Sequence, residues 1–317
     1  MSSPVAIMGA GAWGTALALQ VLRAGAADVT LCARDPAALA AGRTNPRLPG
    51  ITLPAALQIA ATPPPGAILL LAVPTQALRA VSAALPPAAL LVCCAKGVEQ
   101  GTLRLPLEIL GETRPATPAV VLTGPNFAHE VAAGLPAAAV IAGADPAARA
   151  QATAALASPS FRLYGNADAI GAQLGGAAKN VIAIAAGAVI GAGLGENARA
   201  ALITRGVVEL GRLAQALGGR AETMAGLSGL GDLLLTCTGP ASRNYSLGIA
   251  LGQGRALTDI LAERRAVTEG VTTAPALIAR AGEADLPICR AVATWLAGRI
   301  TLPDAIAALL ARRLRDE

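Results

Sequence analysis

The first half of the chain alternates short apolar runs with longer segments of helical period. The apolar runs have the length and continuous hydrophobicity of strands that are buried in a parallel sheet. Five of them lie at residues 5–8, 29–33, 68–73, 90–95 and 120–123, and two further strands are predicted at residues 138–142 and 161–164. Helix-length segments, such as residues 13–24 and 76–85, lie between the strands. This order predicts an α/β domain with a mostly parallel sheet and crossover helices.

The second half of the chain has a different pattern. From about residue 171 the strand pattern fades, and long segments rich in Ala, Leu and Ile with helical period follow. We therefore predict an all-α second domain and place the boundary near residues 166–169, which gives domains at residues 1–167 and 168–317.

A glycine-rich turn follows the first predicted strand directly. Gly9, Gly11 and Gly14 form a GxGxxG pattern between the strand at residues 5–8 and the predicted helix. The first glycine permits the tight turn, the second lets the backbone approach a pyrophosphate, and the third lets the helix pack closely on the strand. The position of the pattern, between a strand and a helix, makes residues 1–167 a Rossmann-type dinucleotide-binding domain in our interpretation.

The residues after the second predicted strand bear on the choice of dinucleotide. Arg34 and Asp35 stand about twenty residues beyond Gly14, where the adenosine ribose is usually contacted. Arg34 would attract the 2′-phosphate of NADP(H), which makes NADP(H) the favoured cofactor. Asp35 keeps NAD(H) open if it accepts the ribose hydroxyls, but it could equally cap the next helix.

Lysine is rare in this arginine-rich chain. Of 25 lysine and arginine residues, only Lys96 and Lys179 are lysines. Surface charge alone is supplied here by arginine, whereas acid–base chemistry near neutral pH needs an amine that can lose its proton. Lys96 follows a predicted strand, and Lys179 lies among small residues that lead into an apolar helix. Both are candidate site residues.

Other titratable residues give weaker signals. The sole histidine, His129, follows the turn at Gly124 and Pro125, and we interpret that turn as the ligand-facing part of the segment. The cysteines at positions 32, 93, 94, 237 and 289 have no CxxC spacing, which favours reduced thiols and a cytoplasmic location. With one histidine, no metal site is expected.

Composition narrows the classes of partner. The chain has 317 residues, 54% of them hydrophobic and 2% aromatic, with a net charge of +5. A nucleic-acid binder would cluster its basic residues and add aromatic stacking residues, so we expect no nucleic acid. The modest positive charge suits a small phosphorylated molecule. We expect no signal peptide. The longest uncharged run, which begins after residue 180, is shorter than the about 18 residues that a membrane-spanning helix needs, so we expect no membrane span.

Several longer motifs occur in a familiar order along about nine-tenths of the chain. They lie at residues 9–18 (GAGAWGTALA), 95–97 (AKG), 124–128 (GPNFA), 173–180 (QLGGAAKN), 225–233 (AGLSGLGDL), 236–238 (TCT), 242–244 (SRN) and 267–270 (VTEG). The chain closely resembles bacterial NAD(P)-dependent glycerol-3-phosphate dehydrogenases. The series is far more specific than the glycine pattern alone.

The resemblance implies roles for individual residues. Lys179 would be the catalytic proton acceptor and donor, with Lys96 and Asp232 at the substrate. Other implied substrate contacts are Gly124, Asn126, Ser242, Arg243 and Asn244. The implied cofactor contacts, besides Gly9, Gly11, Gly14, Arg34 and Lys96, are Ala12, Trp13, Ala128, Arg243, Val267 and Glu269. Ala12 stands where the family often has serine, and Asn126 where a small hydroxyl is common, so individual hydrogen bonds differ there.

The implied activity is the reversible oxidation of sn-glycerol 3-phosphate to dihydroxyacetone phosphate, which supplies glycerol 3-phosphate for phospholipid synthesis. Two alternatives stay open. A related two-domain reductase for a non-phosphorylated hydroxy acid would not need Arg243, and a dinucleotide-binding sensor would not need both lysines. A homodimer is compatible with the sequence, which does not define the oligomeric state.

Overall fold

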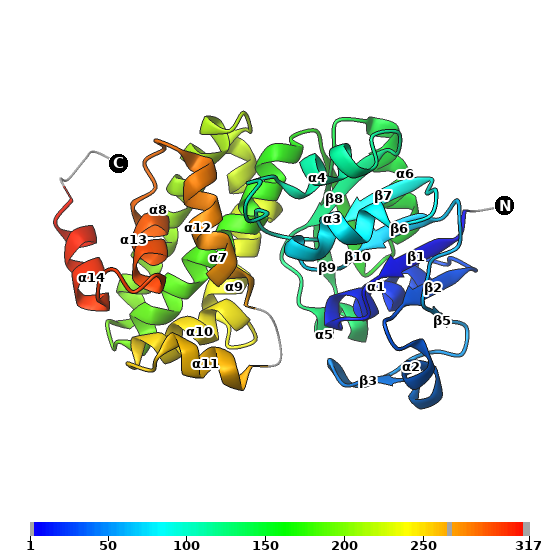
Figure 1. Cartoon of the computed structure of the whole chain (residues 1–317), viewed down its shortest axis with the longest axis horizontal. Coiled ribbons are helices and arrows are strands. Elements are labelled where there is room, and N and C mark those ends of the chain that lie inside the picture. Colours follow the sequence, from blue (N-terminus) through cyan, green and yellow to red (C-terminus); the bar gives the residue numbers. More distant parts are fainter. Residues whose placement is uncertain (1–2, 265–267, 313–317) are drawn as a thin grey trace. The chain divides into compact units, whose positions relative to one another are not determined.

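The first part of the fold is built on one eight-stranded sheet (Figure 1). The structure, a computed structural model, describes residues 3–264 and 268–312. The sheet order is β10-β9-β8-β7-β6-β1-β2-β5, and every neighbouring pair is parallel except β8 with β9. The strands are β1 (Val5–Met8), β2 (Val29–Cys32), β5 (Gln58–Ala60), β6 (Ile68–Leu71), β7 (Leu90–Cys93), β8 (Ala119–Thr123), β9 (Ala137–Ala142) and β10 (Phe161–Asn166). The predicted mostly parallel sheet and its seven predicted strands are confirmed.

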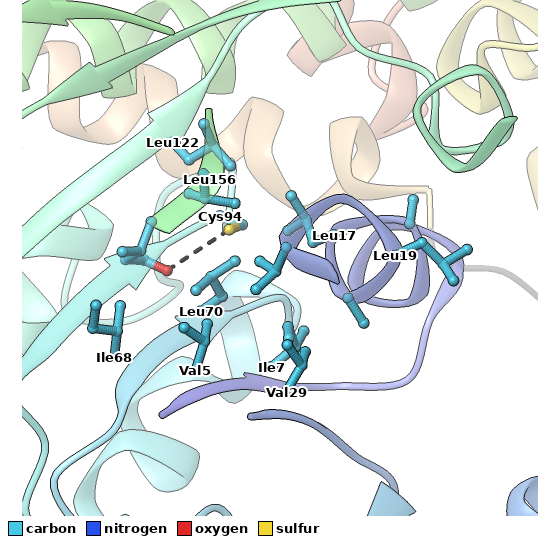
Figure 2. Close-up of a cluster of buried hydrophobic side chains, with 14 of the residues drawn as sticks. Val5, Ile7, Leu17, Leu19, Val29, Ile68, Leu70, Cys94, Leu122 and Leu156 are labelled. Atoms are coloured by element: carbon cyan, nitrogen blue, oxygen red, sulfur yellow. Dashed lines mark hydrogen bonds between the residues drawn. The ribbon is translucent and has the colours of Figure 1, made fainter. Parts of the chain in front are cut away.

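Both faces of this sheet are covered by helices, which explains the continuous apolar runs. Alternate strand residues enter two separate core clusters, since successive side chains point to opposite faces. Ile7 belongs to one cluster with Leu17 of α1 (Ala12–Arg23), and Figure 2 shows both side chains in it. Ala6 belongs to the other cluster with Leu78 of α3 (Thr75–Ala83). A strand that is buried on both faces has no polar face, so its sequence shows no alternation of apolar and polar residues.

Two helices of this part were predicted from the sequence. Helix α1 matches the predicted segment 13–24, and α3 matches the predicted segment 76–85, each within two residues. The remaining helices are α2 (Pro36–Gly42), α4 (Pro106–Thr113), α5 (Ala128–Ala133) and α6 (Pro146–Leu156). Helices α2 and α6 each begin after an aspartate, Asp35 and Asp145, whose carboxylate accepts a backbone N–H of the first turn.

One segment of the first part has no counterpart among the predicted elements. Strands β3 (Thr44–Asn45) and β4 (Leu48–Thr52) form a small antiparallel pair apart from the main sheet, and β5 follows them. Strands β3 and β5 have only two and three residues, and β4 contains Pro and Gly, so these strands lack the hydrophobic runs by which the other strands are recognised. We refer to residues 43–57 as the arm.

The chain divides into two compact units. The first unit comprises Met1–Lys96 and Arg104–Gln173, and the second comprises Gly97–Leu103 and Leu174–Glu317. The division therefore falls inside helix α7 (Ala169–Gly191), a few residues after the boundary expected from the sequence. Compact units are defined by contacts and not by ligands, so the functional division at residues 167 and 168 stays a prediction.

Residues 174–312 of the second unit contain helices and no strand where the structure describes them. The described helices are α7 to α14: α8 (Gly195–Ala216), α9 (Asp232–Thr238), α10 (Arg243–Gly252), α11 (Leu257–Glu263), α12 (Glu269–Ala281), α13 (Pro287–Leu296) and α14 (Leu302–Leu310) follow α7. A 3₁₀ turn, η1 (Ala221–Ala225), and a π turn, η2 (Leu227–Gly231), precede α9. The predicted all-α character is confirmed.

Helix α7 corrects one expectation. The apolar run counted from residue 180 belongs to a helix of 23 residues that starts at Ala169, and this helix is long and apolar enough to cross a membrane. However, 89% of its most apolar window is buried inside the folded chain. A core helix has the same length and composition, so α7 is weak evidence for a membrane span.

Helices α7 and α10 approach each other closely through glycines. A methyl group on Gly187 of α7 would collide with the carbonyl oxygen of Tyr245, and one on Gly248 of α10 would collide with the carbonyl oxygen of Ile184. Gly191 and Gly252 meet carbonyl oxygens of the opposite helix in the same way. The two helices therefore touch backbone to backbone, which side chains with a Cβ would prevent.

This crossing predicts a strong effect of a single methyl group. We expect Gly248→Ala to lower the free energy of unfolding by about 3 kcal/mol, since the helices must separate to admit the Cβ. Gly111→Ala, in an exposed turn of α4 with no atom within 4 Å of the added Cβ, is the control. It should be neutral or stabilise by about 0.5–1 kcal/mol. Urea unfolding followed by circular dichroism measures both, and equal values would contradict the close crossing.

Candidate active site

The glycine-rich turn joins β1 to α1 as the sequence predicts. Gly9 has a φ of +106°, and a Cβ there would lie 2.7 Å from the carbonyl oxygen of Ala72. A Cβ on Gly14 would collide with the carbonyl oxygen of Gly9, so only glycine fits at this position in the first turn of α1. Gly11 is different, because no atom lies within 4 Å of the position of its missing Cβ.

The open space at Gly11 lies at the N-terminus of a twelve-residue helix. The first backbone N–H groups of a helix have no partner within it, and the helix dipole adds positive potential there. Ala12 and Trp13, the first two residues of α1, contribute such groups. These features fit the pyrophosphate of a dinucleotide.

Asp35 caps the following helix, which is one of the two roles that the sequence left open for it. Its carboxylate accepts the backbone N–H of Ala38 at 3.1 Å and caps α2. Arg34, the residue before it, is also exposed, two residues after the end of β2. Both charged side chains are therefore exposed at this strand end, and the Asp35 carboxylate also caps a helix.

Lys96 and Gly124 come together at neighbouring strand ends. The Lys96 ammonium donates a hydrogen bond to the carbonyl oxygen of Gly124 at 3.3 Å. Asn126 follows two residues later, and its Nδ2 donates to the carbonyl oxygen of Ala138 at 3.1 Å. The Asn126 Oδ1 atom is buried and has no hydrogen-bond partner within the described residues. An unpaired buried acceptor two residues after the glycine that Lys96 contacts fits a ligand that carries a hydroxyl or amide donor.

Lys179 lies in the middle of α7 and forms a buried ion pair with Asp232. The side chains are 10% and 1% exposed, and Nζ donates to Oδ1 of Asp232. The pairing supplies the countercharge that a buried ammonium requires. The hydrogen bond to the carboxylate therefore holds the Lys179 amine at one place within the buried part of α7.

Local backbone geometry brings Asp232 to this lysine. Gly175 lies one helical turn before Lys179, and a Cβ there would collide with the carbonyl oxygen of Ser228. The missing side chain lets η2 lie directly against α7, and Asp232 is the first residue of α9 after η2. Gly175 of the QLGGAAKN motif thus lets the AGLSGLGDL motif approach α7 and supports the ion pair.

Cys237 lies among the same charges. Burial raises the pKa of its thiol to about 12, although the positive charges of Lys179 and Arg199 oppose the shift. The thiol therefore stays protonated near neutral pH. All five cysteines are buried and free, as the sequence indicates for reduced thiols.

Ser242, Arg243 and Asn244 form the start of α10. The Ser242 hydroxyl caps the helix by accepting the backbone N–H of Tyr245 at 3.2 Å. Asn244 is buried, and its amide donates to Oδ1 of Asn180 at 2.9 Å and accepts the backbone N–H of Gly270 at 3.0 Å. The amide links α10 to the residue next to Lys179, whereas Arg243 is exposed.

Sequence reasoning missed Arg264 in this region. Its guanidinium donates to the carbonyl oxygen of Arg243 at 2.7 Å and to the Ser246 hydroxyl at 3.1 Å. The pKa of Arg264 is lowered, first by burial and then by the charge of Arg243. Two cations therefore lie close together at the start of α10. No motif marked Arg264, because arginine is common throughout this chain.

The remaining sequence-predicted residues have mixed surroundings. Trp13 packs against the core cluster of the sheet and contacts the Cys94 thiol, so part of its role is packing. Ala128 begins α5 and Glu269 begins α12, while Val267 lies outside the described residues. His129 has a side chain that is 63% exposed, beside Glu130. Within the described residues, no three His, Cys, Asp or Glu side chains gather as metal ligands would.

A Rossmann-type sheet with a phosphate-binding turn, followed by a helical unit with a buried lysine–carboxylate pair, defines a nicotinamide-dependent dehydrogenase. The family model for the N-terminus of NAD-dependent glycerol-3-phosphate dehydrogenase matches residues 4–149, and that for the C-terminus matches residues 168–307. The chain belongs to this family.

Individual relatives agree with this assignment. The chain is 56% identical over 315 residues to glycerol-3-phosphate dehydrogenase [NAD(P)+] of Gluconobacter oxydans, with 97% of each chain covered. It is 58% identical over 318 residues to the enzyme of that name from Acidiphilium cryptum, with 98% of each covered. Among solved structures, glycerol-3-phosphate dehydrogenase from Coxiella burnetii has a TM-score of 0.91 at 36% identity, with 98% of this chain and 99% of that chain covered.

Proposed function

We propose that this chain catalyses the reversible NAD(P)-dependent oxidation of sn-glycerol 3-phosphate to dihydroxyacetone phosphate. The observation that carries the proposal is the buried Lys179–Asp232 pair, since a lysine is held there in a fold that binds a dinucleotide. The family relationship supports the same reaction. The reduction supplies glycerol 3-phosphate for phospholipid synthesis.

Lys179 has the acid–base role in this proposal. In reduction its ammonium gives a proton to the carbonyl oxygen of dihydroxyacetone phosphate, and in oxidation the neutral amine takes the proton of the C2 hydroxyl. The nicotinamide, when bound, gives or accepts the hydride at C2. Asp232 keeps the amine in position through their hydrogen bond.

The substrate phosphate and hydroxyls require other residues. We assign the phosphate to Arg243, with Ser242 and Asn244 around it, because an arginine fork matches phosphate geometry. Lys96, Gly124 and Asn126 are assigned to the rest of the substrate, and the unpaired Oδ1 of Asn126 supports this assignment. The functional domains of the proposal are residues 1–167 for the dinucleotide and 168–317 for substrate and catalysis.

For the cofactor we propose a preference for NADP(H) without a metal ion. The exposed Arg34 and the engagement of Asp35 as a helix cap support the preference. The residues assigned to the cofactor are those that the family resemblance implies: Gly9, Gly11, Ala12, Trp13, Gly14, Arg34, Lys96, Ala128, Arg243, Val267 and Glu269. Buried free cysteines support action in the cytoplasm, and the homodimer stays a prediction.

One assay separates this proposal from its alternatives. Reduction of dihydroxyacetone phosphate is followed with NADPH and NADH in parallel, beside a non-phosphorylated β-keto acid as competing substrate. We expect turnover with the phosphate ester alone. Turnover of the keto acid would favour the related hydroxy-acid reductase, and bound NADPH without any turnover would favour a sensor.

The cofactor assignment predicts the effect of Arg34→Asp. The substitution replaces attraction for the 2′-phosphate by repulsion, so the ratio of kcat/KM with NADPH to that with NADH should fall by at least tenfold. Arg162→Asp on the exposed edge of β10 changes the net charge equally and should leave the ratio unchanged. Equal ratios in both variants would show that Arg34 does not recognise the cofactor.

The phosphate assignment predicts the effect of Arg243→Ala. Loss of a charged hydrogen bond to phosphate should raise the KM for dihydroxyacetone phosphate by an amount equivalent to about 1.5–3 kcal/mol, with little change in thermal unfolding. Arg255→Ala serves as the control, because Arg255 is an exposed arginine of the same unit that pairs with Glu263 at 2.6 Å. Wild-type KM and kcat in Arg243→Ala would place the phosphate elsewhere.

The acid–base assignment predicts the effect of Lys179→Arg. The guanidinium keeps the positive charge but cannot release a proton near neutral pH, so hydride transfer should slow by about 10²–10⁴-fold. NADPH affinity should change only a few-fold, because the dinucleotide is assigned mainly to the first domain. Single-turnover kinetics and NADPH fluorescence titration measure the two quantities, and circular dichroism checks the fold. A variant with more than a tenth of the wild-type rate would exclude Lys179 as the proton-transfer residue and turn attention to Lys96.

A further inference from the structure

Asn45, in the arm, is bound directly to the glycine-rich turn. Its Nδ2 donates to the carbonyl oxygen of Ala10 at 3.1 Å and to the hydroxyl of Thr15 at 2.7 Å. Its Oδ1 accepts the backbone N–H of Arg47 at 3.0 Å. Asn45 is 4% exposed and Thr15 is fully buried, so water does not compete for these bonds. One side chain thus holds the turn at two points.

The chemistry of the three partners fixes the orientation of the Asn45 amide. A carbonyl oxygen accepts only, and the backbone N–H of Arg47 donates only. With the amide turned over, its oxygen would face the Ala10 oxygen and its NH₂ would face an N–H group. Both amide hydrogens are used in the observed orientation, which makes the contact specific for asparagine.

The contact with Ala10 determines where the next N–H group points. The C=O and N–H of a trans peptide lie in one plane and point in opposite directions. Because Asn45 holds the Ala10 carbonyl on its own side, the N–H of Gly11 is directed to the other side. The glycine turn needs its N–H groups to face a bound pyrophosphate, and Asn45 sets this direction for the peptide before Gly11.

The arm is anchored well enough to act as a fixed support. The Arg43 guanidinium donates to the carbonyl oxygens of Leu53 and Leu57, each at 3.2 Å, and also to that of Pro54. Leu53 and Leu57 are 2% and 1% exposed and belong to the core cluster of the sheet. Asn45 is therefore held by the core, and the turn is held by Asn45.

We infer that Asn45 is a positioning residue for the cofactor: it fixes the Ala10–Gly11 peptide and the start of α1 so that the turn receives the pyrophosphate without rearrangement. The inference rests on the proposed function, since it concerns the same dinucleotide. NAD(H) and NADP(H) share the pyrophosphate and differ only at the 2′-position. Asn45 therefore acts on both cofactors equally, in contrast to Arg34.

The first test is the affinity of Asn45→Ala for NADPH and for NADH, each titrated by fluorescence without substrate. We expect both Kd values to rise by about tenfold, with their ratio unchanged, because a preorganised hydrogen-bonded turn is lost. At saturating NADPH, kcat and the KM for dihydroxyacetone phosphate should stay within twofold of wild type. A residue that only stabilised the fold would lower the melting temperature without this selective change in Kd.

Two further substitutions test the partner of Asn45. Thr15→Ser keeps the hydroxyl that accepts from Asn45 and should bind both cofactors as wild type does. Thr15→Val keeps the shape and removes the hydroxyl, and it should weaken binding by several-fold. In the double variant Asn45→Ala/Thr15→Val the two losses should not multiply, since they break one shared contact.

The matched control is Gln58→Ala, which removes another side-chain amide of the first unit. Gln58 donates to Asp28 at 3.0 Å in an exposed position and does not contact the glycine turn. Its Kd values should equal those of wild type. Hydrogen exchange of the protein without nucleotide gives an independent measurement: residues 9–15 should exchange faster in Asn45→Ala and not in Gln58→Ala.

The outcomes distinguish the inference from the proposed function. Wild-type protein that binds neither nucleotide would refute the proposed function and the inference together. Wild-type binding with unchanged Kd values in Asn45→Ala would refute the role of Asn45 alone, as would a Kd that changes for only one of the two cofactors. Equal losses for both cofactors, with faster exchange at residues 9–15, would establish it.

Discussion

The rest of the helical unit depends on burying one charged lysine. Residues 171–189 of α7 are all buried, and Lys179 lies among them with a positive charge that an apolar interior does not tolerate alone. Asp232 must therefore come within hydrogen-bond distance, and it must come from a separate segment. The π turn before Asp232 and the glycine at position 175 are consequences of this requirement, because only a backbone without side chains at the contact lets α7 and the turn meet.

The same means of packing recurs through this aromatic-poor chain. With 2% aromatic residues, its core is filled mainly by aliphatic side chains, and glycines let helices approach closely where no large side chain fills the space between them. Glycines 187, 191, 248 and 252 let α7 and α10 touch, and the contact brings Asn244 to Asn180, beside Lys179. A high glycine content, which by itself suggests flexibility, here produces rigidity. Lys179 is thus fixed beside helix contacts that are made by residues with almost no side chain.

Much of this could be predicted from the sequence, and the exceptions have physical reasons. Seven strands of the main sheet were predictable because burial on both faces leaves a continuous apolar run, and Lys179 stood out because arginine supplies nearly all other positive charge. Strands β3 and β4 could not be predicted, since they carry no such run. Arg264 could not either, because its importance lies in the residues it contacts and not in its own type. The motifs located Asp232, but only the structure shows that its partner is Lys179.

The arm and the glycine turn show a related division of tasks. The glycines make the turn sterically possible because they have no side chains, but this does not fix the orientation of each peptide group. A directional hydrogen bond is needed to fix that orientation, and Asn45 provides it from a segment thirty residues further along the chain. In the proposed function Arg34, between these two segments, determines which dinucleotide is preferred, and within the described residues it makes no hydrogen bond to the peptide that Asn45 holds. The proposal thus assigns the shape of the turn to the glycines, the orientation of its peptide to Asn45 and the choice of dinucleotide to Arg34, so that each could change without disrupting the other two.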